Sequence, residues 1–133
     1  MLITGGSGTI GSAIARAGLA AGINRICIFS RGEAAQARMR DEVNDEHLRF
    51  FVGDVRDRWR LRRALEGVQT VYHCAALKRI ETGAYNPIEM VRTNVDGAVN
   101  LIEASMDAGV RRVVVCSTDK AFEPVSPYGY SKA

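Results

Sequence analysis

Short apolar runs alternate with longer stretches of helical periodicity along this 133-residue chain. The apolar runs are rich in β-branched residues and nearly uninterrupted, which is typical of strands that are covered on both faces. The predicted strands are Leu2 to Thr4, Arg25 to Ser30, Leu48 to Val52, Thr70 to Cys74 and Arg112 to Ser117. Their alternation with helices predicts a parallel sheet joined by right-handed crossovers.

Capping residues define the helices between these strands. The predicted helices are Ile10 to Ala21, Glu33 to Val43, Arg58 to Glu66 and Ile88 to Ala108. Three of them are followed by a glycine that suits the left-handed conformation past a helix end, namely Gly22, Gly67 and Gly109. Pro87 suits a first helical turn, and Asp57 is a predicted N-cap. We therefore predict one α/β domain over residues 1 to 133, a doubly wound parallel sheet of the Rossmann type, truncated after the fifth strand.

The composition is that of an ordinary globular protein, with 47% hydrophobic and 25% charged residues. The Arg-rich stretch from Arg56 to Arg63 is interpreted as a solvated helix face, because no aromatic ladder or nucleic-acid-binding motif accompanies it. No run of about 18 apolar residues occurs, and no basic segment precedes a long apolar stretch at Met1. We expect a soluble, cytoplasmic chain with no membrane span, no export signal and no nucleic-acid partner.

Three cysteines, Cys27, Cys74 and Cys116, lie in apolar runs that are predicted strands. Their number is odd and no pair has the CxxC spacing. We therefore expect buried free thiols and neither disulfides nor a metal site.

The stretch ITGGSGTIGSAIA predicts a strand, a glycine turn and a helix in succession. Gly5, Gly8 and Gly11 have the GxxGxxG spacing, and Gly6, Gly8 and Gly11 also satisfy GxGxxG. Such glycines let the backbone approach a pyrophosphate, while the helix start supplies N–H groups and a positive dipole end. Because the turn opens the first of several βαβ units, the sequence predicts that this chain binds a dinucleotide.

The end of the second predicted strand bears on the choice of dinucleotide. Ser30 is followed by Arg31, where an Asp or Glu would grip a ribose 2′-hydroxyl. A guanidinium there suits a 2′-phosphate, so NADP is favoured over NAD. Glu33 lies near enough to keep NAD open, and Arg31 could also be an ordinary exposed residue at a helix start.

Two further stretches follow predicted strands and complete the cofactor set. GDVRD places Asp54 and Val55 where an adenine could lie, and HCAALK offers the small Ala75 and Ala76 for close backbone approach. The predicted cofactor-binding residues are Gly5, Gly8, Thr9, Ile10, Gly11, Ser30, Arg31, Asp54, Val55, Ala75, Ala76, Lys78, Tyr128 and Lys132.

The last residues carry candidate chemistry. Tyr128 and Lys132 form a YxxxK pair whose side chains meet on one face if Pro127 opens a helix. A neighbouring ammonium and a cationic nicotinamide both favour the tyrosinate form, which can act as a base.

The motifs TGGSGTIG, GDVRD, HCAALK, YNP, TNVDG, STDKA and YGYSK occur in this order. In order and spacing they resemble the extended short-chain dehydrogenase/reductase superfamily. Within it the chain resembles the soluble, inverting UDP-N-acetylglucosamine 4,6-dehydratases of bacterial polysaccharide and glycan biosynthesis. The resemblance covers essentially the whole chain, and Tyr128 stands where membrane-bound members usually carry Met.

This resemblance implies roles for five residues and a UDP-N-acetylhexosamine substrate. Tyr128 would take the proton of the sugar C4 hydroxyl, and Lys132 would hold the ribose. Lys120 would remove the C5 proton and Asp119 would protonate the departing C6 hydroxyl, while Thr118 would hydrogen-bond the C4 oxygen or the tyrosine. A lysine base must lose its proton part of the time, through burial or nearby cations such as Lys78 and Lys132. Asp119 and Lys120 could instead form a simple loop salt bridge.

The resemblance also implies a longer chain, because family members add a sixth strand and a segment that holds the nucleotide sugar. An apolar face left exposed by the missing part would invite self-association, so we expect a homo-oligomer. We therefore expect a fragment that exposes an apolar face and shows little turnover alone. The alternatives are a 4-epimerase or reductase of the same superfamily, which would not need Lys120, and a non-catalytic dinucleotide-binding module. His73 is expected to pack at a strand end, and Asn94 to bond backbone groups within a helix.

Overall fold

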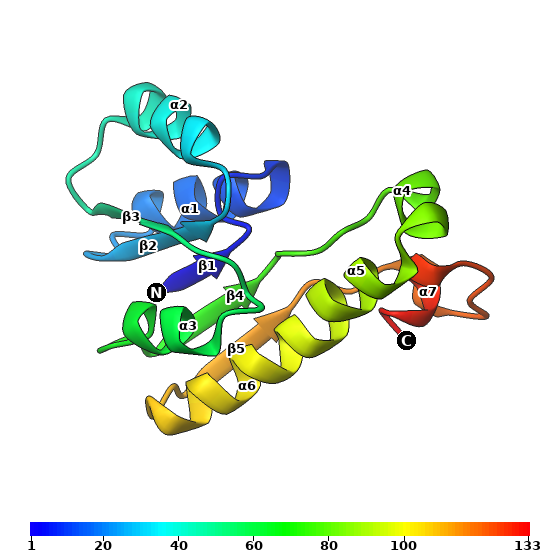
Figure 1. Cartoon of the computed structure of the whole chain (residues 1–133). Helices are drawn as coiled ribbons and strands as arrows, with labels where there is room; N and C mark the ends of the chain where they lie inside the picture. Colours follow the sequence, from blue (N-terminus) through cyan, green and yellow to red (C-terminus); the bar gives the residue numbers. More distant parts are fainter.

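The structure, a computed structural model, describes residues 1–133 and contains one five-stranded sheet (Figure 1). Its strands are β1 Leu2–Thr4, β2 Ile26–Ser30, β3 Leu48–Val52, β4 Thr70–His73 and β5 Arg112–Val115. All neighbouring strands are parallel, in the order β3-β2-β1-β4-β5. The order reverses between β1 and β4, which is the arrangement of a doubly wound Rossmann sheet. The predicted fold class is confirmed.

Helices cover both faces of this sheet (Figure 1). On one face lie α1 Thr9–Ala20 and α2 Glu33–Val43, and on the other lie α3 Arg58–Ala64 and α6 Gly97–Asp107. The core is accordingly split in two. One buried cluster joins alternate strand residues to Ala15 and Met39, and the other joins them to Leu61 and Leu101. Nearly every residue of β1 and β2 is buried, as the uninterrupted apolar runs predict.

The predicted capping residues are confirmed, although α1 and α3 end one and two residues earlier than predicted. Gly22, Gly67 and Gly109 each have a φ near +70°, the left-handed conformation that stops a helix. The Asp57 carboxylate accepts a hydrogen bond of 2.9 Å from the Arg60 amide and so caps α3. Pro87 opens the helix α5 Pro87–Val91.

The prediction of one continuous helix from Ile88 to Ala108 is wrong. The segment consists of α5, a π-helical turn η1 at Arg92–Asp96, and α6. Asn94 lies in that turn, is buried, and bonds groups outside its own helix. A π-helical turn is unfavourable by itself, and the bonds from Asn94 to Leu77 compensate for it. Hydrophobic periodicity carries no information about such distant bonds, so the sequence did not predict the turn.

Two short helices complete the chain, α4 Ile80–Tyr85 and α7 Pro127–Tyr130, together with a 3-10 turn η2 at Asp119–Ala121. The sequence did not predict α4. It has no side-chain N-cap and contains Gly83, whose Cα faces Met90 so closely that an added Cβ would lie 2.5 Å from the Met90 Cε. Packing on α5 therefore compensates for poor intrinsic helix propensity.

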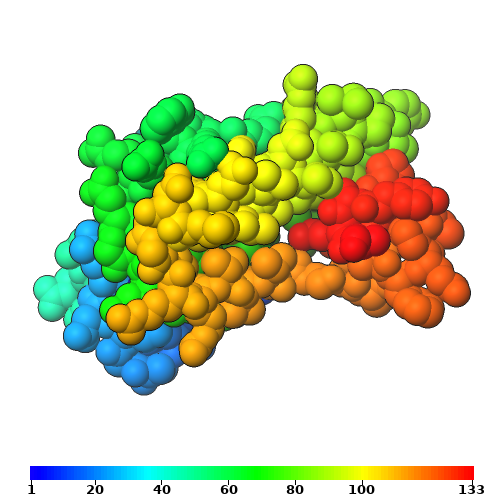
Figure 2. Space-filling model, turned by 90° about the horizontal axis from the view of Figure 1, so that it is seen from below, coloured from blue at the N-terminus to red at the C-terminus, as the bar shows by residue number.

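An apolar face is exposed on α6 and the edge strand β5, as expected. Figure 2 shows this side of the molecule, where α6 lies beside α3 and β5 runs along the edge. Exposed apolar side chains recur at helical spacing along it and on the adjoining strand, namely Val95, Val99, Ile102, Met106 and Val115. The residues of the Arg-rich stretch are exposed except Leu61, so its α3 part is a solvated helix face, on which Arg58 pairs with Glu103 and Asp107 of α6. No helix combines the length and the apolar character needed to cross a membrane.

Candidate functional site

A cavity of about 700 Å³ lies at the carboxyl ends of the strands, around the point where the strand order reverses. Every residue predicted to bind a cofactor lines it. The cavity runs from the glycine turn and Arg31 to Tyr128 and Lys132. Its volume is in the range of small-molecule and cofactor sites.

The glycine turn is packed backbone against backbone. Gly5 has a φ of +64°, and a Cβ added to it would lie 2.8 Å from the Ala75 nitrogen. A Cβ on Gly11 would lie 2.5 Å from the Gly5 carbonyl oxygen. Only glycine fits at these two positions, because backbone atoms cannot move away as the end of a side chain can.

The start of α1 offers free hydrogen-bond donors to the cavity. Gly8 is the N-cap and supplies no side-chain cap, and Thr9, Ile10 and Gly11 form the first turn. The first N–H groups of a helix have no partner within the helix, and its dipole attracts negative charge there. A pyrophosphate fits this part of the cavity.

A buried glutamine, which the sequence analysis missed, holds the far end of the cavity. Gln36 is 2% exposed. Its Nε2 donates to the Ser30 carbonyl oxygen (3.1 Å), the Ser30 Oγ (2.9 Å) and the Phe51 carbonyl oxygen (2.8 Å). The Ser7 hydroxyl donates to the Ser30 Oγ over 2.8 Å. Gln36 thus joins the ends of β2 and β3 and, through Ser30, the glycine turn. The only signal of this role in the sequence is a single amide side chain on the inner side of an Ala-rich helix.

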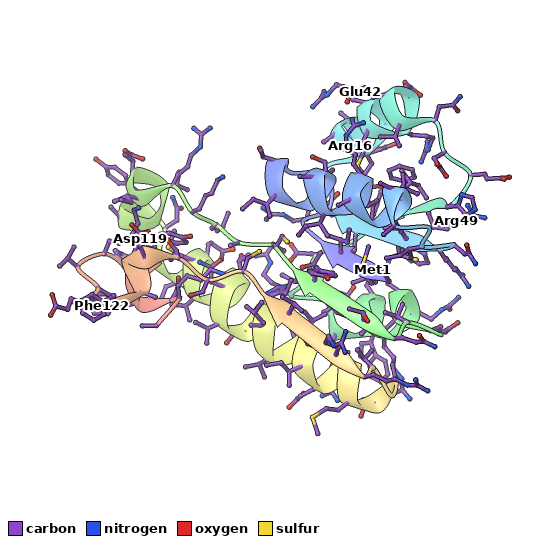
Figure 3. All side chains as sticks on the ribbon, turned by 180° about the vertical axis from the view of Figure 1, so that it is seen from behind. Met1, Arg16, Glu42, Arg49, Asp119 and Phe122 are labelled. Carbon is purple, nitrogen blue, oxygen red and sulfur yellow. The ribbon has the colours of Figure 1, made fainter.

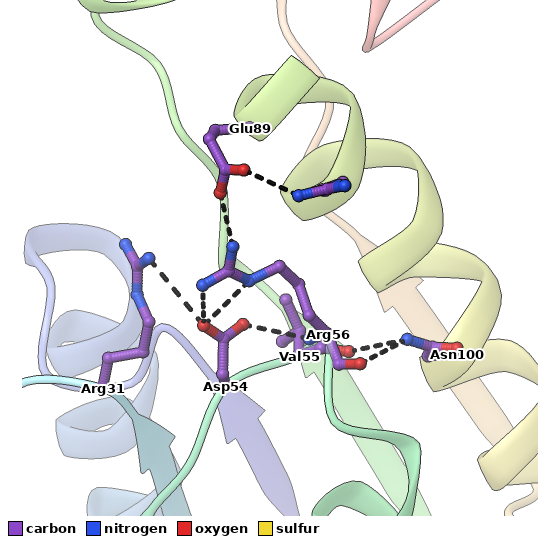
Figure 4. Close-up of polar contacts among 7 residues, drawn as sticks. Arg31, Asp54, Val55, Arg56, Glu89 and Asn100 are labelled. Atoms are coloured by element: carbon purple, nitrogen blue, oxygen red, sulfur yellow. Dashed lines mark hydrogen bonds and ion pairs between the residues drawn. The ribbon is translucent and has the colours of Figure 1, made fainter. Parts of the chain in front are cut away.

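Figure 4 shows a chain of charges beside this end of the cavity. The Asp54 Oδ2 lies 3.9 Å from Arg31 and accepts two hydrogen bonds from Arg56, of 3.0 and 2.8 Å. Arg56 also donates to Glu89 of α5 over 2.6 Å. Burial alone would raise the pKa of Asp54, but the hydrogen bonds from Arg56 outweigh it and hold that pKa below its usual value. Asp54 therefore presents a fixed carboxylate.

His73 lies beneath the cavity and packs at the end of β4, as predicted. It is 1% exposed, and its Nδ1 lies 2.6 Å from the Thr4 Oγ1. Burial, with a smaller effect of the Lys132 ammonium, lowers the pKa of His73 to about 4. The Thr4 Oγ1 also accepts a hydrogen bond from the Ala75 amide, so this pair supports the loop that lines the cavity.

Tyr128 and Lys132 lie at the other end of the cavity. Pro127 opens α7, as predicted, and the Ser126 hydroxyl caps it by accepting from the Gly129 amide. The Lys132 Nζ donates to the Cys116 carbonyl oxygen over 3.1 Å, and burial lowers the pKa of Lys132. Both side chains therefore face the same space as the glycine turn.

Thr118, Asp119 and Lys120 do not line the cavity. Figure 3 shows Asp119 on the segment that projects beyond the end of the sheet. Its carboxylate is 88% exposed, lies 3.6 Å from the Lys120 Nζ and accepts from the Thr118 hydroxyl over 3.0 Å. The Thr118 hydrogen bond and then the Lys120 charge lower the pKa of Asp119. Lys120 is half exposed, so the burial expected of a lysine base is not present. Asp119 and Lys120 therefore form the loop salt bridge that the sequence analysis gave as the alternative to a catalytic role.

Asn94 ties the segment that follows β4 to the residue that follows α7. Its Oδ1 accepts from the Leu77 amide over 2.8 Å, and its Nδ2 donates to the Leu77 carbonyl oxygen and to the Ser131 hydroxyl over 2.9 and 2.8 Å. The prediction that Asn94 bonds backbone groups is confirmed. These groups belong to Leu77, which lies outside the helix that carries Asn94.

The prediction of buried thiols holds only for Cys27. Cys74 and Cys116 are half-buried, lie just past the ends of β4 and β5, and line the cavity. Both strands are shorter than predicted, because pairing stops where the chain turns around the cavity. The two sulfur atoms are 3.4 Å apart as free thiols.

Comparisons with known proteins agree with this fold. The sequence profile of a family described as "Polysaccharide biosynthesis protein" matches residues 1–133. A Methanocaldococcus jannaschii protein named "Uncharacterized membrane protein MJ1061" is 45% identical over 99% of the chain. A Rickettsia conorii UDP-glucose 4-epimerase and a Campylobacter jejuni UDP-N-acetylglucosamine 4,6-dehydratase (inverting) are each 42% identical, over 100% and 99% of it. The chain spans 40% of the length of each of these relatives.

Two solved structures have the same fold. Pen from Bacillus thuringiensis superposes with a TM-score of 0.96 at 37% identity, over 98% of this chain and 41% of its own. DesIV, a dTDP-glucose 4,6-dehydratase from Streptomyces venezuelae with NAD and TYD bound, superposes with a TM-score of 0.88 at 34% identity, over 98% and 47%.

Proposed function

Because this chain belongs to the polysaccharide biosynthesis protein family of the extended short-chain dehydrogenases/reductases, we propose that it is the dinucleotide-binding part of a nucleotide-sugar 4,6-dehydratase. The proposed activity is the NADP-dependent, C5-inverting dehydration of UDP-N-acetylglucosamine in the cytoplasm. One observation carries the proposal. A single cavity joins an uncapped helix start and an exposed guanidinium to a tyrosine–lysine pair.

The residues around the cavity fit a nicotinamide dinucleotide. The glycine turn and the start of α1 would hold the pyrophosphate, Asp54 and Val55 the adenine side, and Lys132 the nicotinamide ribose. When bound, the cofactor supplies a reversible hydride acceptor beside Tyr128. Each of these parts is built from local backbone or from a side chain that already lines the cavity.

The choice of NADP rests on Arg31. Its guanidinium is 54% exposed at the cavity edge, and its nearest anion, Asp54, is 3.9 Å away and already bonded by Arg56. A 2′-phosphate could therefore bind Arg31, with the Ser30 hydroxyl beside it. The solved DesIV structure holds NAD, so the chain itself has to be tested.

We expect Arg31→Ala to weaken NADP binding by roughly 10- to 100-fold, because one charge-assisted hydrogen bond contributes about 1.5 to 3 kcal/mol. NAD, which has no 2′-phosphate, should bind the variant about as well as the wild type. Calorimetric titration with both cofactors measures the two ratios. An equal loss for both would contradict the NADP assignment.

The reaction would use the side chains at the Tyr128 end. The Tyr128 oxygen would take the proton of the sugar C4 hydroxyl, with the Lys132 ammonium favouring the tyrosinate. A keto group at C4 acidifies the proton on C5, which Lys120 would remove while Asp119 protonates the departing C6 hydroxyl. Since Asp119 and Lys120 now pair with each other outside the cavity, the proposal requires this segment to turn inward over the sugar.

Isotope exchange tests the dehydratase assignment. The longest protein that the gene encodes around this chain would be incubated with UDP-N-acetylglucosamine in deuterated water. We expect a 4-keto product with deuterium at C5. Lys120→Ala should abolish C5 exchange and keep hydride transfer at C4, and Tyr128→Phe should abolish both. Arg63→Ala, on the exposed face of α3, is the control that should change neither.

A 4-epimerase is the second candidate. The Rickettsia relative with this name is as similar as the dehydratase, and an epimerase needs Tyr128 and Lys132 but not Lys120. The salt bridge between Asp119 and Lys120 is compatible with such an enzyme. Conversion of UDP-glucose to its C4 epimer, unchanged in Lys120→Ala, would favour this function over the dehydratase.

A further inference from the structure

Two of the three thiols come together although they are 42 residues apart in the sequence. Cys74 follows β4 and Cys116 follows β5, and the Cys116 amide donates to the His73 carbonyl oxygen over 3.0 Å, which continues the parallel ladder. The sulfurs lie 3.4 Å apart. Neighbouring strands are about 4.8 Å apart, which is within the Cα separation that a disulfide can bridge.

The cavity gives access to this pair. Cys74 and Cys116 are half-buried and line the cavity near Tyr128 and Lys132, whereas Cys27 is buried in the core. Because both cysteines line the cavity, a small thiol reagent can reach their sulfurs through the space that the dinucleotide would fill. Occupancy of the cavity and reactivity of the pair are therefore linked.

We propose that Cys74 and Cys116 form a thiol-modification site inside the cavity, which small-molecule disulfides oxidise to an intramolecular disulfide when the cavity is empty. A bound dinucleotide shields it, a point that rests on the proposed function. The site would take disulfides of the glutathione class as its oxidant.

The chemistry is an ordinary thiol–disulfide exchange. The thiolate of one cysteine attacks a sulfur of the oxidant, whose S–S bond breaks and releases one thiol, and a mixed disulfide forms. The second cysteine then attacks the protein sulfur of the mixed disulfide and releases a second thiol. Two electrons pass from the cysteine pair to the oxidant, and the two cysteine protons end on the released thiols.

The order of the two attacks follows from the surroundings. Burial and the hydrogen bond with Cys116 raise the pKa of Cys74 to about 12, so Cys74 is protonated at neutral pH. We therefore expect Cys116 to make the first attack. Once the Cys116 sulfur is part of a mixed disulfide with the oxidant, it is no longer a thiol that hydrogen-bonds Cys74. Cys74 then acts as the resolving cysteine.

The test incubates the folded chain with oxidised glutathione and follows intact mass and peptide maps. We expect a species lighter by two hydrogen atoms, linked between Cys74 and Cys116 and never to Cys27. Cys74→Ser should stop at the glutathione adduct on Cys116, and Cys116→Ser should react much more slowly. A folded chain that keeps both thiols free, or that links Cys27, would overturn the proposal.

The rate of disulfide formation with and without dinucleotide tests the claim that a bound dinucleotide shields the thiol pair. If only the empty form reacts, NADPH at 100 times its Kd should slow disulfide formation by about 100-fold. An unchanged rate in a chain that calorimetry shows to be saturated would overturn the shielding while leaving the proposed function intact. If calorimetry finds no NADPH binding, the proposed function fails, and the disulfide measured without cofactor still decides whether the thiol pair exists.

Discussion

The cavity has two walls that are built in opposite ways. The turn wall, residues 5–11, is backbone packed on backbone, with contacts so close that Gly5 and Gly11 cannot carry a Cβ. The closing wall belongs to residues 116–133, of which only Cys116, Ser117, Tyr128 and Lys132 line the cavity. This segment forms a short turn and one helical turn, and its residues Asp119, Phe122 and Val125 are exposed and do not line the cavity. The difference indicates that cofactor binding is organised in advance, whereas the groups that would act on a sugar still need contacts from elsewhere.

Few bonds hold the closing wall to the rest of the chain. The Asn94 amide reaches Ser131, and Lys132 reaches the Cys116 carbonyl oxygen within the wall itself. A wall held by so few polar contacts should open at a low free-energy cost compared with global unfolding. The two walls should therefore respond differently to substitution.

The largest expected effect is on the turn wall. Gly11→Ala places a Cβ within 2.5 Å of the Gly5 carbonyl oxygen, so the turn must deform. We expect NADPH affinity to fall by roughly 100-fold, equivalent to about 3 kcal/mol. Calorimetric titration measures it.

Gly18→Ala is the matched control on the same helix. Its added Cβ would meet only the ends of flexible side chains, Met1 Cε at 2.8 Å and Ile26 Cδ1 at 2.9 Å, far from the cavity lining. This variant should bind NADPH like the wild type. Equal losses in both variants would mean that general packing, and not the turn wall, controls binding.

The next effect concerns pH, because burial and, to a smaller extent, the Lys132 ammonium of the closing wall lower the pKa of His73. The folded pKa of His73 is about 4, below the ordinary value of 6.5, so the unfolded chain binds more protons between these values. The contribution of the neutral His73 ring to the free energy of unfolding is fully present above about pH 6.5. As the pH falls toward 4, the free energy of unfolding drops by about 3 kcal/mol.

Urea unfolding at several pH values measures this loss. The carboxylates with lowered pKa, Asp45, Asp54 and Asp119, titrate below this range. His73→Gln should be less stable at neutral pH but nearly independent of pH between 4 and 6.5. A variant with the same pH slope as the wild type would show that another group titrates.

The smallest global effect is expected at Asn94, which holds the closing wall to the segment that follows β4. Asn94→Ala leaves the Leu77 amide and carbonyl unpaired and should cost about 1 to 3 kcal/mol of unfolding free energy. Its local effect should be larger, because the bond to Ser131 is lost. Hydrogen exchange should speed up in residues 126–133 and stay unchanged in β1 and β2. Uniformly faster exchange would contradict a closing wall that opens on its own.

Sequence patterns predicted the turn wall well because its determinants are local. Glycine spacing, a β-branched run and a helix start lie within about a dozen residues, and every predicted cofactor residue lines the cavity. Patterns failed where contacts are distant. The π-helical turn depends on Asn94 reaching Leu77, the anchoring of Ser30 depends on Gln36, and the thiol pair depends on the pairing of β4 with β5.

We propose that one cavity orients a nicotinamide dinucleotide between the turn wall and Tyr128. The most direct measurement is the set of nuclear Overhauser effects between bound NADPH and the side chains of the chain. We expect contacts from the nicotinamide ring protons to the Tyr128 ring and from the adenine protons to the Val55 methyl groups. Adenine contacts at Tyr128, or saturating NADPH without contacts to either residue, would contradict it.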